Sequence, residues 1–331
     1  MKKRCRWGVA MCLLVAAGCG GAKTAEPAAP TPGPSAPAEQ RAEPAGPEVN
    51  RAVASIKAGD FKSAKAALDK ALQKNPKDGA ALYYLGVLLE KQGDRQGAEQ
   101  KYKEAIEAAP EVVEAAVNLA AIYTEQKKYD DAIAVLHKGL AKRPDDPELH
   151  ANMAFALDAK GDKTGALAEY ERAVKVVGDN AQLRLAYGQL LLESGNKVKA
   201  ASELRGALGA AGSDRALLAT IGRLLGQAGS FADCVAALDK AVGAGDDPEL
   251  RVRRGVCRHE LKDEPGAKSD FEAAIKIDPK FAPAHYYLGE SLMATGNAAA
   301  AAKEFDLAAA TGKPELANRA KARAQAARKK K

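Results

Sequence analysis

The sequence predicts an all-α solenoid of about eight two-helix repeats, and three observations lead to that prediction. The same order of small and large residues returns every 34 residues through most of the 331-residue chain. Alanine is abundant while only 5% of the residues are aromatic, which favours helices over β-sandwiches and β-barrels. A Gly followed by Asp, Asn or Ser recurs in most repeats, as expected of a turn between two helices.

The first 18 residues have the organisation of a signal peptide. Four basic residues precede the uncharged stretch Gly8–Gly18, which at about 1.5 Å per residue is too short to cross a bilayer core of about 30 Å. Small residues followed by Cys19 resemble the lipobox of bacterial lipoproteins, except that Ala16 stands where that pattern usually has Leu. The resemblance implies cleavage before Cys19, diacylglycerol on its sulfur and palmitate in the anchor. An ordinary secretory signal that contains a cysteine is the alternative.

Residues 19–47 are predicted to be a tether between the lipidated Cys19 and the folded part. Seven prolines are spread among alanines there, so the segment cannot form a helix or a hydrophobic core. At about 3.1 Å per residue, an extended chain of this length reaches up to about 90 Å. The repeats are therefore expected to stand away from the membrane surface.

Three positions of each repeat, numbered from the start of its first helix, explain how its two helices pack. Position 8 in the first helix is always Ala or Gly, position 20 in the second helix is small, and position 24 is large and apolar. Two helices approach to about 8 Å only where side chains are small, so position 8 marks the contact. The residues at position 8 are Ala52, Gly86, Ala120, Ala154, Gly188, Gly222, Gly255 and Gly289.

Turn residues and prolines set the helix ends. A Gly between the two helices fits a left-handed position, and the Asp, Asn or Ser after it caps the second helix. The second helices are expected to end just before Pro76, Pro110, Pro144 and Pro279. Residues 314–331 are predicted to form a basic capping helix, with Leu316, Ala320 and Ala327 facing the last repeat.

This pattern resembles the tetratricopeptide repeat (TPR), with eight units over residues 48–313. The resemblance implies a right-handed superhelix of helix–turn–helix repeats. It also implies a concave surface that binds a protein or peptide and is lined mainly by positions 2, 5, 6, 9, 12 and 13 of the first helices.

The predicted concave surface is apolar with acidic edges. Positions 5 and 9 are mostly apolar and include Tyr83, Phe155 and Tyr286. Such a surface suits a peptide with hydrophobic anchors and basic groups. The alternative is that the acidic residues form only a solvent-exposed face without a partner. The acids are Glu90, Glu114, Glu125, Glu148, Asp158, Glu193, Glu249 and Glu260.

Asn118 and Asn152, both at position 6, are predicted to contact the peptide backbone. They resemble the asparagines with which some TPR proteins hold a peptide, because one amide group both donates and accepts hydrogen bonds. The Lys, Asn and Arg set of a carboxylate clamp is absent from the corresponding positions, so binding of a free C-terminus is not expected.

Repeat seven departs from the pattern because Arg251, Arg254 and Arg258 stand where other repeats have apolar groups. A lone buried arginine is costly, so Arg254 is predicted to pair with Asp270 of the second helix, as in some TPRs. Exposure of both groups to solvent is the alternative.

Two cysteines remain in the predicted repeats, Cys234 in the second helix of repeat six and Cys257 in the first helix of repeat seven. The cell envelope permits a disulfide, and these two helices are neighbours. Cys234 also fits as a small buried residue at position 20. The sequence leaves both possibilities open, and a Cα separation above about 7 Å would exclude the bond.

Motifs that carry catalysis or bind metal are not found in the sequence. There is no His-Glu-x-x-His, paired Cys-x-x-Cys or Gly-x-Ser-x-Gly, and the four side chains from Cys257 to Glu260 do not converge if they lie on a helix. The sequence therefore predicts no enzyme activity, no catalytic residue, no cofactor, no metal site and no small-molecule substrate.

The distribution of charge argues against nucleic acid as a partner. The net charge is +7, but residues 1–18 and 313–331 together hold 12 of the 50 basic residues and one of the 43 acidic residues. The remainder is mildly acidic, which disfavours binding to a phosphate backbone.

The leading hypothesis is a lipid-anchored, non-enzymatic scaffold for a protein partner, similar to pilotin and motility lipoproteins that help assemble envelope complexes such as secretins and pili. The expected location is the outer membrane, facing the periplasm. Regulation or activation of an envelope enzyme, such as a cell-wall synthase or hydrolase, is the alternative.

Overall fold

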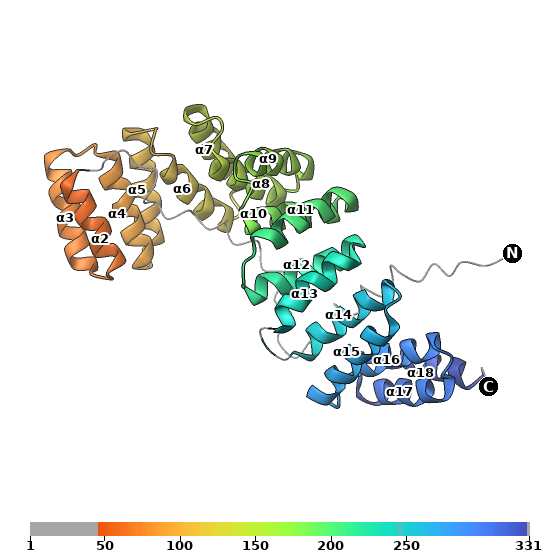
Figure 1. The fold of residues 1–331 in the computed structure, drawn as a ribbon. Helices are drawn as coiled ribbons and strands as arrows, with labels where there is room; N and C mark the ends of the chain where they lie inside the picture. The colour runs from red at the N-terminus through yellow and green to blue at the C-terminus, as the bar shows by residue number, and fades with distance from the viewer. Residues whose placement is uncertain (1–45, 244, 246, 330–331) are drawn as a thin grey trace. The chain divides into compact units, whose positions relative to one another are not determined.

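The computed structural model describes residues 46–243, 245 and 247–329. Over this part of the chain the backbone forms 17 α-helices, α2 to α18, and no β-strand (Figure 1). The predicted signal peptide, Cys19 and residues 19–45 of the predicted tether lie outside the described residues.

Sixteen of the helices form eight helix–turn–helix pairs at the places where the 34-residue period predicted them. The first helices are α2 (Pro47–Lys57), α4 (Gly79–Lys91), α6 (Val113–Glu125), α8 (Pro147–Lys160), α10 (Ala181–Glu193), α12 (Arg215–Ala228), α14 (Pro248–Glu260) and α16 (Ala282–Ala294). The second helices are α3 (Phe61–Lys74), α5 (Arg95–Ala108), α7 (Tyr129–Lys142), α9 (Lys163–Val176), α11 (Lys197–Ala210), α13 (Phe231–Gly243), α15 (Glu264–Ile277) and α17 (Ala298–Thr311). The prediction of an all-α TPR solenoid is confirmed.

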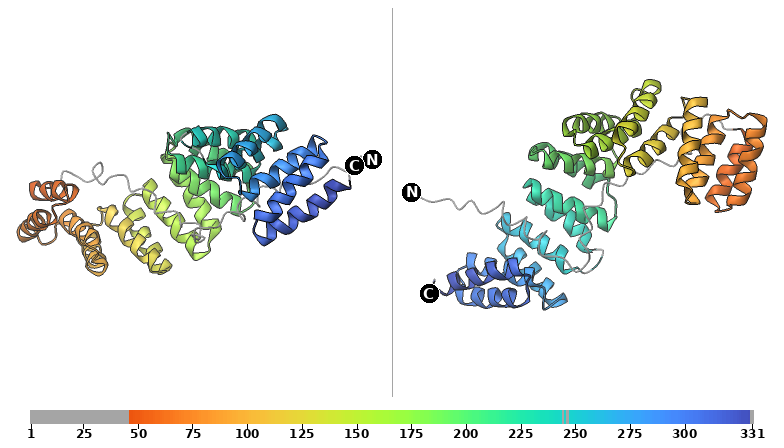
Figure 2. Two further views of the ribbon diagram at one scale, coloured as in Figure 1. Left: turned by 90° about the horizontal axis from the view of Figure 1, so that it is seen from below. Right: turned by 180° about the vertical axis from the view of Figure 1, so that it is seen from behind.

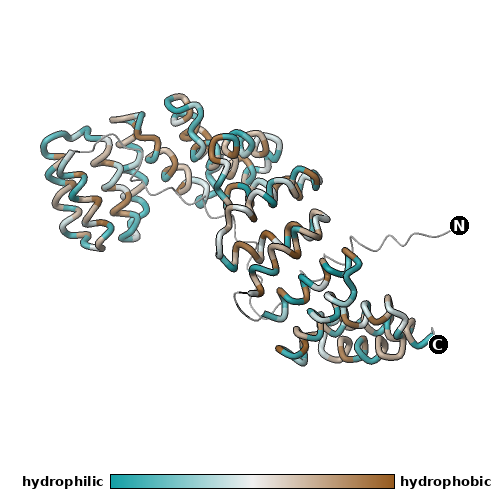
Figure 3. Tube along the Cα trace, viewed as in Figure 1, coloured by the Kyte–Doolittle hydropathy of each residue, from teal (hydrophilic) through white to brown (hydrophobic). Residues whose placement is uncertain are grey.

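The chain divides into two compact units, whose described parts are residues 46–183 and 184–329 without 244 and 246. A continuous core of buried apolar side chains runs through the first unit from Val49 to Ala156, and another runs through the second from Val252 to Ala327. Helices of neighbouring repeats lie side by side within each unit (Figure 2). Hydrophobic and hydrophilic residues alternate along each helix, as expected of amphipathic helices (Figure 3).

Positions 8 and 24 are in close contact inside each repeat that has glycine at position 8. A Cβ atom on Gly86 would lie 2.5 Å from the ring of Tyr102, and one on Gly255 would lie 2.5 Å from the ring of Phe271. The same overlap occurs in three further repeats, between Gly188 and Leu204, Gly222 and Leu238, and Gly289 and Phe305. The large partners are all buried, so a glycine here leaves the space that the position-24 side chain fills.

Six of the predicted turn glycines adopt positive φ, from 76° at Gly59 to 97° at Gly161. Repeats three and seven have no glycine at this place, and Lys127 (φ 60°) and Lys262 (φ 70°) take the left-handed conformation instead. The geometry of the turn thus overrides the preference of lysine, at a cost of about 1 kcal/mol per residue.

The last helix, α18 (Pro314–Arg328), packs against α17 and covers the end of the last repeat. Leu316, Ala320 and Ala327 are buried, as expected from the sequence. None of the helices within the described residues combines the length and the apolar composition needed to cross a membrane.

Replacing Gly86 by alanine is expected to destabilise the protein by about 1–3 kcal/mol, because the new methyl group overlaps the buried ring of Tyr102. The matched control is Gly209→Ala in α11, at an exposed site with no atom within 4 Å, where alanine is expected to stabilise by about 0.5–1 kcal/mol. Urea unfolding followed by circular dichroism measures both changes. Equal effects of the two substitutions would contradict the packing described above.

Candidate peptide-binding surface

Neighbouring first helices contact each other directly, which creates the surface where the sequence placed a partner. In the first unit α2 packs on α4 and α6 packs on α8. In the second unit α14 packs on both α12 and α16. Side chains from successive repeats therefore lie next to one another within each unit.

Asn118 belongs to a chain of hydrogen bonds that links α4, α5 and α6. Its Nδ2 donates to the hydroxyl oxygen of Tyr102 (3.1 Å), and that hydroxyl donates to Oε2 of Glu90 (2.8 Å). Burial and the nearby Glu90 carboxylate raise the pKa of Tyr102, so the hydroxyl keeps its proton. The ring of Tyr83 lies 5.9 Å from that of Tyr102. Asn118 itself is half-buried and is thus held in place at the surface.

Asn152 is less accessible than its equivalent Asn118. It is 6% exposed, and its Nδ2 donates to the backbone oxygen of Glu148 in the same helix (2.9 Å). Phe155, one turn further along α8, is half-buried, whereas Tyr83 is buried. The predicted contact of these residues with a peptide stays a prediction, and Asn118 and Phe155 are the two that solvent reaches best.

Tyr286, the third aromatic residue predicted to contact a peptide, lies next to the capping helix. Its side chain is 4% exposed, and the guanidinium of Arg319 on α18 lies 5.6 Å from the ring centroid. Arg323 of the same helix forms an ion pair with Glu290, one turn from Tyr286 on α16. The capping helix therefore lies against this part of α16, and the contact of Tyr286 with a peptide stays a prediction.

Cations neutralise part of the acidic edge that the sequence predicted. Glu114 lies 3.3 Å from Nη1 of Arg143, and Glu125 lies 2.9 Å from Nη1 of Arg95. Glu249 also forms an ion pair, with an arginine of its own helix. The acidic character of the surface is therefore weaker than the count of carboxylates suggests.

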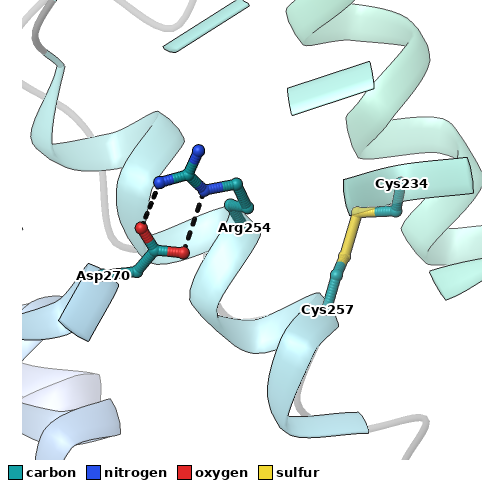
Figure 4. The surroundings of a disulfide bond; sticks show 4 residues. All are labelled: Cys234, Arg254, Cys257 and Asp270. Atoms are coloured by element: carbon teal, nitrogen blue, oxygen red, sulfur yellow. Dashed lines mark hydrogen bonds and ion pairs between the residues drawn. A yellow bond between two sulfur atoms is a disulfide. The ribbon is translucent and has the colours of Figure 1, made fainter. Parts of the chain in front are cut away.

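The predicted Arg254–Asp270 ion pair is present and is part of a larger cluster (Figure 4). Asp270 is 2% exposed and accepts from Nε of Arg254 (2.9 Å) and from Nη1 of Arg258 (2.9 Å). Nη1 of Arg254 also donates to Asp239 on α13 (2.8 Å). The hydrogen bond to Asp270 is the main cause that raises the pKa of Arg254. The cluster thus ties α14 to both α13 and α15.

Cys234 and Cys257 form a disulfide, with their Cα atoms 6.4 Å apart (Figure 4). The bond joins α13 to α14 and is buried. Of the two possibilities that the sequence left open, the structure contains the disulfide.

Three buried or half-buried pairs of a basic and an acidic side chain were not predicted from the sequence, and all three have the same spacing in sequence. A basic residue at position 4 of the first helix binds a glutamate 19 residues later, at position 23 of the second helix. The pairs are His150–Glu169, Arg184–Glu203 and His285–Glu304. They do not assemble into a metal site, since among the described residues no three His, Cys, Asp or Glu side chains are grouped to hold a metal ion.

His285 shows how such a pair works. Its Nδ1 lies 2.7 Å from Oε2 of Glu304, and its Nε2 lies 3.0 Å from the backbone oxygen of Pro279. A carbonyl oxygen only accepts hydrogen bonds, so Nε2 carries a hydrogen, and a ring protonated on both nitrogens satisfies both contacts. The hydrogen bond to Glu304 is the main cause that raises the pKa of His285.

Comparison with known proteins agrees with the repeat pattern. One family model described as the tetratricopeptide repeat matches residues 89–154, and another matches residues 49–111, 152–215, 220–280 and 265–317. The matches cover more than half of the chain. No curated protein matches the sequence.

Several solved structures are similar in fold. A tetratricopeptide repeat protein from Parabacteroides merdae is 20% identical with a TM-score of 0.48, over 74% of this chain and 97% of that one. PilW, a widely conserved type IV pilus biogenesis factor, is 17% identical with a TM-score of 0.50, over 62% of this chain and 95% of that one. Yeast Tom70 is 16% identical with a TM-score of 0.47, over 87% of this chain and 65% of that one. At these identities the likeness shows the fold alone.

The His285–Glu304 pair is expected to make stability depend on pH. The pKa of His285 is raised in the folded state above its ordinary value of about 6.5, so its contribution is complete below that value and is lost as pH rises through the folded pKa. The excess unfolding free energy of the wild type over His285→Gln is therefore expected to fall as the pH is raised above about 6.5, as measured by urea unfolding. His137→Gln, at an exposed site on α7, controls for the loss of an imidazole. A constant excess would contradict the assignment.

Proposed function

Because the chain belongs to the tetratricopeptide repeat family, we propose that it is a non-enzymatic scaffold that binds a protein or peptide partner on the first helices of its repeats. The observation that carries the proposal is the direct packing of neighbouring first helices, α6 on α8 in the first unit and α12 on α14 in the second. Such packing brings side chains of several repeats onto one surface, which an extended or helical peptide needs for multiple anchors.

The first unit offers both kinds of group that a peptide requires. Phe155 supplies apolar surface on α8, and Asn118 supplies an amide on α6 that a hydrogen bond to Tyr102 orients. An amide that is already oriented loses little entropy when it binds a peptide backbone. Asn118 and Phe155 are therefore the residues proposed to contact the partner.

The N-terminal sequence supports a place in the bacterial cell envelope. A signal-like segment ending at Cys19, followed by a proline-rich tether, suits a lipid-anchored protein whose repeats reach away from the membrane. PilW, which shares the fold, is a type IV pilus biogenesis factor. The proposed role is assembly of an envelope complex at the outer membrane, such as a secretin, a pilus or a motility machine.

Partner capture tests the proposed surface. The full chain carrying Asn118→Ala and Phe155→Ala is expected to recover at least about tenfold less of its crosslinked partner from intact envelopes than the wild type, because about 1.4 kcal/mol of contact energy is lost. The control carries His137→Ala and Lys138→Ala, two exposed residues on the second helix α7.

Quantitative mass spectrometry of the crosslinked complexes measures the recovery. Equal recovery by both double variants would reject the surface. A cell-wall synthase or hydrolase as the partner would assign the chain to regulation of an envelope enzyme instead of assembly.

The lipid anchor is tested separately. Cys19→Ser is expected to abolish incorporation of radiolabelled palmitate and to move the protein from the membrane fraction to the soluble fraction, because serine offers no sulfur for diacylglycerol. Cys12→Ser, within the predicted signal peptide, is the matched control and is expected to leave labelling unchanged. Palmitate labelling of the Cys19→Ser protein would contradict the anchor.

A further inference from the structure

A small pocket lies beside the disulfide in the second unit, between α12, α13 and α14. It is shallow and open to solvent. Its lining consists of Gly222, Arg223, Gly226, Cys234, Arg253, Val256 and Cys257, and it is called the arginine pocket below. Arg223 and Val256 stand at position 9 of their repeats and Arg253 at position 6, so the pocket opens on the surface formed by the first helices.

Arg223 is the unusual residue of this pocket. Within the described residues, its one hydrogen bond runs from Nη1 to Oε1 of Gln227, at the long distance of 3.4 Å. No carboxylate of the described part of the chain forms an ion pair with it, in contrast to other half-buried arginines of the unit, such as Arg184 and Arg254. Burial and, after it, repulsion by Arg253 lower the pKa of Arg223.

Arg253 brings a second guanidinium into the pocket, and its own charge is largely balanced. Its side chain is 13% exposed, and its Nε donates to Oε1 of Glu249 (3.0 Å). Glu249 also attracts Arg223, yet one carboxylate faces two guanidinium groups. The three groups together carry a net positive charge, and removing such a charge from water is costly unless an anion pairs with it.

The remaining walls of the pocket are apolar or small. Gly222 and Gly226 have no side chain, and the disulfide and Val256 offer no strong hydrogen-bonding group. A ligand that fits must therefore combine one anionic group for the guanidiniums with a few methylene groups for the walls. The side chain of glutamate or aspartate has this composition, and a planar carboxylate matches the donors of a guanidinium.

We propose that the arginine pocket binds the side-chain carboxylate of an acidic residue in the protein partner. The inference rests on the proposed function, since it names one chemical feature of the partner that the surface would bind. It also modifies the expectation from the sequence, where the acids alone pointed to a partner with basic groups. In the second unit the arginine pocket carries a net positive charge, which attracts an acidic group instead.

The test uses a defined probe, a fluorescein-labelled deca-glutamate peptide with an acetylated N-terminus and an amidated C-terminus. It is titrated against the full chain and followed by fluorescence anisotropy at 50 and 200 mM salt. We expect Arg223→Gln to weaken binding at least about tenfold. Arg205→Gln, at an exposed arginine of α11 paired with Asp233, removes the same charge outside the pocket and is expected to change the affinity less than twofold.

Two further peptides identify the source of the carboxylate. An amidated deca-glutamine is expected to bind the wild type at least about tenfold more weakly than deca-glutamate. Deca-glutamine with a free C-terminal carboxylate is expected to stay equally weak. If it binds as tightly as deca-glutamate, the pocket takes a chain end and the proposal is overturned.

The remaining outcomes are also decisive. Absence of deca-glutamate binding to the wild type, or equal loss in Arg223→Gln and Arg205→Gln, overturns the proposal. Thermal unfolding controls for folding, and Arg223→Gln is expected to unfold at or above the temperature of the wild type because it breaks no ion pair. If the peptide test fails but partner capture still depends on Asn118 and Phe155, the arginine pocket is rejected and the proposed function stands. If peptide binding requires Arg223 but partner capture does not depend on Asn118 and Phe155, the proposed surface of the first unit is rejected and the arginine pocket stands.

Discussion

The contact between a small residue at position 8 and a large one at position 24 sets the distance between the two helices of every repeat. Where position 8 is glycine, a single methyl group would already overlap the partner, as at Gly86 and Tyr102. The same contact shapes the candidate surface, because a Tyr102 ring held in the core places its hydroxyl between Glu90 and Asn118. Core packing and the orientation of a surface amide thus depend on one residue pair.

The repeat period was sufficient to predict the helices, because the two helices of each repeat pack through the same small and large positions. What it did not predict are features that break the repetition. Lys127 and Lys262 take left-handed turns because closure of the turn fixes φ whatever residue stands there. Arg319 of α18 lies 5.6 Å from the ring centroid of Tyr286, and the packing of a terminal helix does not follow from the period.

Charges were the least predictable part of the candidate site. A survey of first-helix positions finds the carboxylates but not their partners, because these stand about one repeat away in sequence. Arg143 follows Glu114 by 29 residues, and Arg95 precedes Glu125 by 30. The pairs at a spacing of 19 were missed as well, because their members lie on the two different helices of one repeat. Only the arrangement in space shows which charges remain unbalanced, and Arg223 is the clearest case.

An ion-pair cluster and a disulfide hold α14 against its neighbouring helices, and Figure 4 shows the Arg254–Asp270 pair and the disulfide. Arg254 and Arg258, one turn apart, bind Asp270 of α15 and Asp239 of α13, while Cys257 bonds covalently to α13. Arg253 lies one turn from Cys257, so the disulfide fixes the helix face that carries it into the pocket. A guanidinium held by Glu249 on a helix held by its neighbours loses little freedom on binding. The main free-energy cost of binding a carboxylate there is therefore the desolvation of the carboxylate. Arg223 is already desolvated, so its attraction to the carboxylate offsets part of that cost.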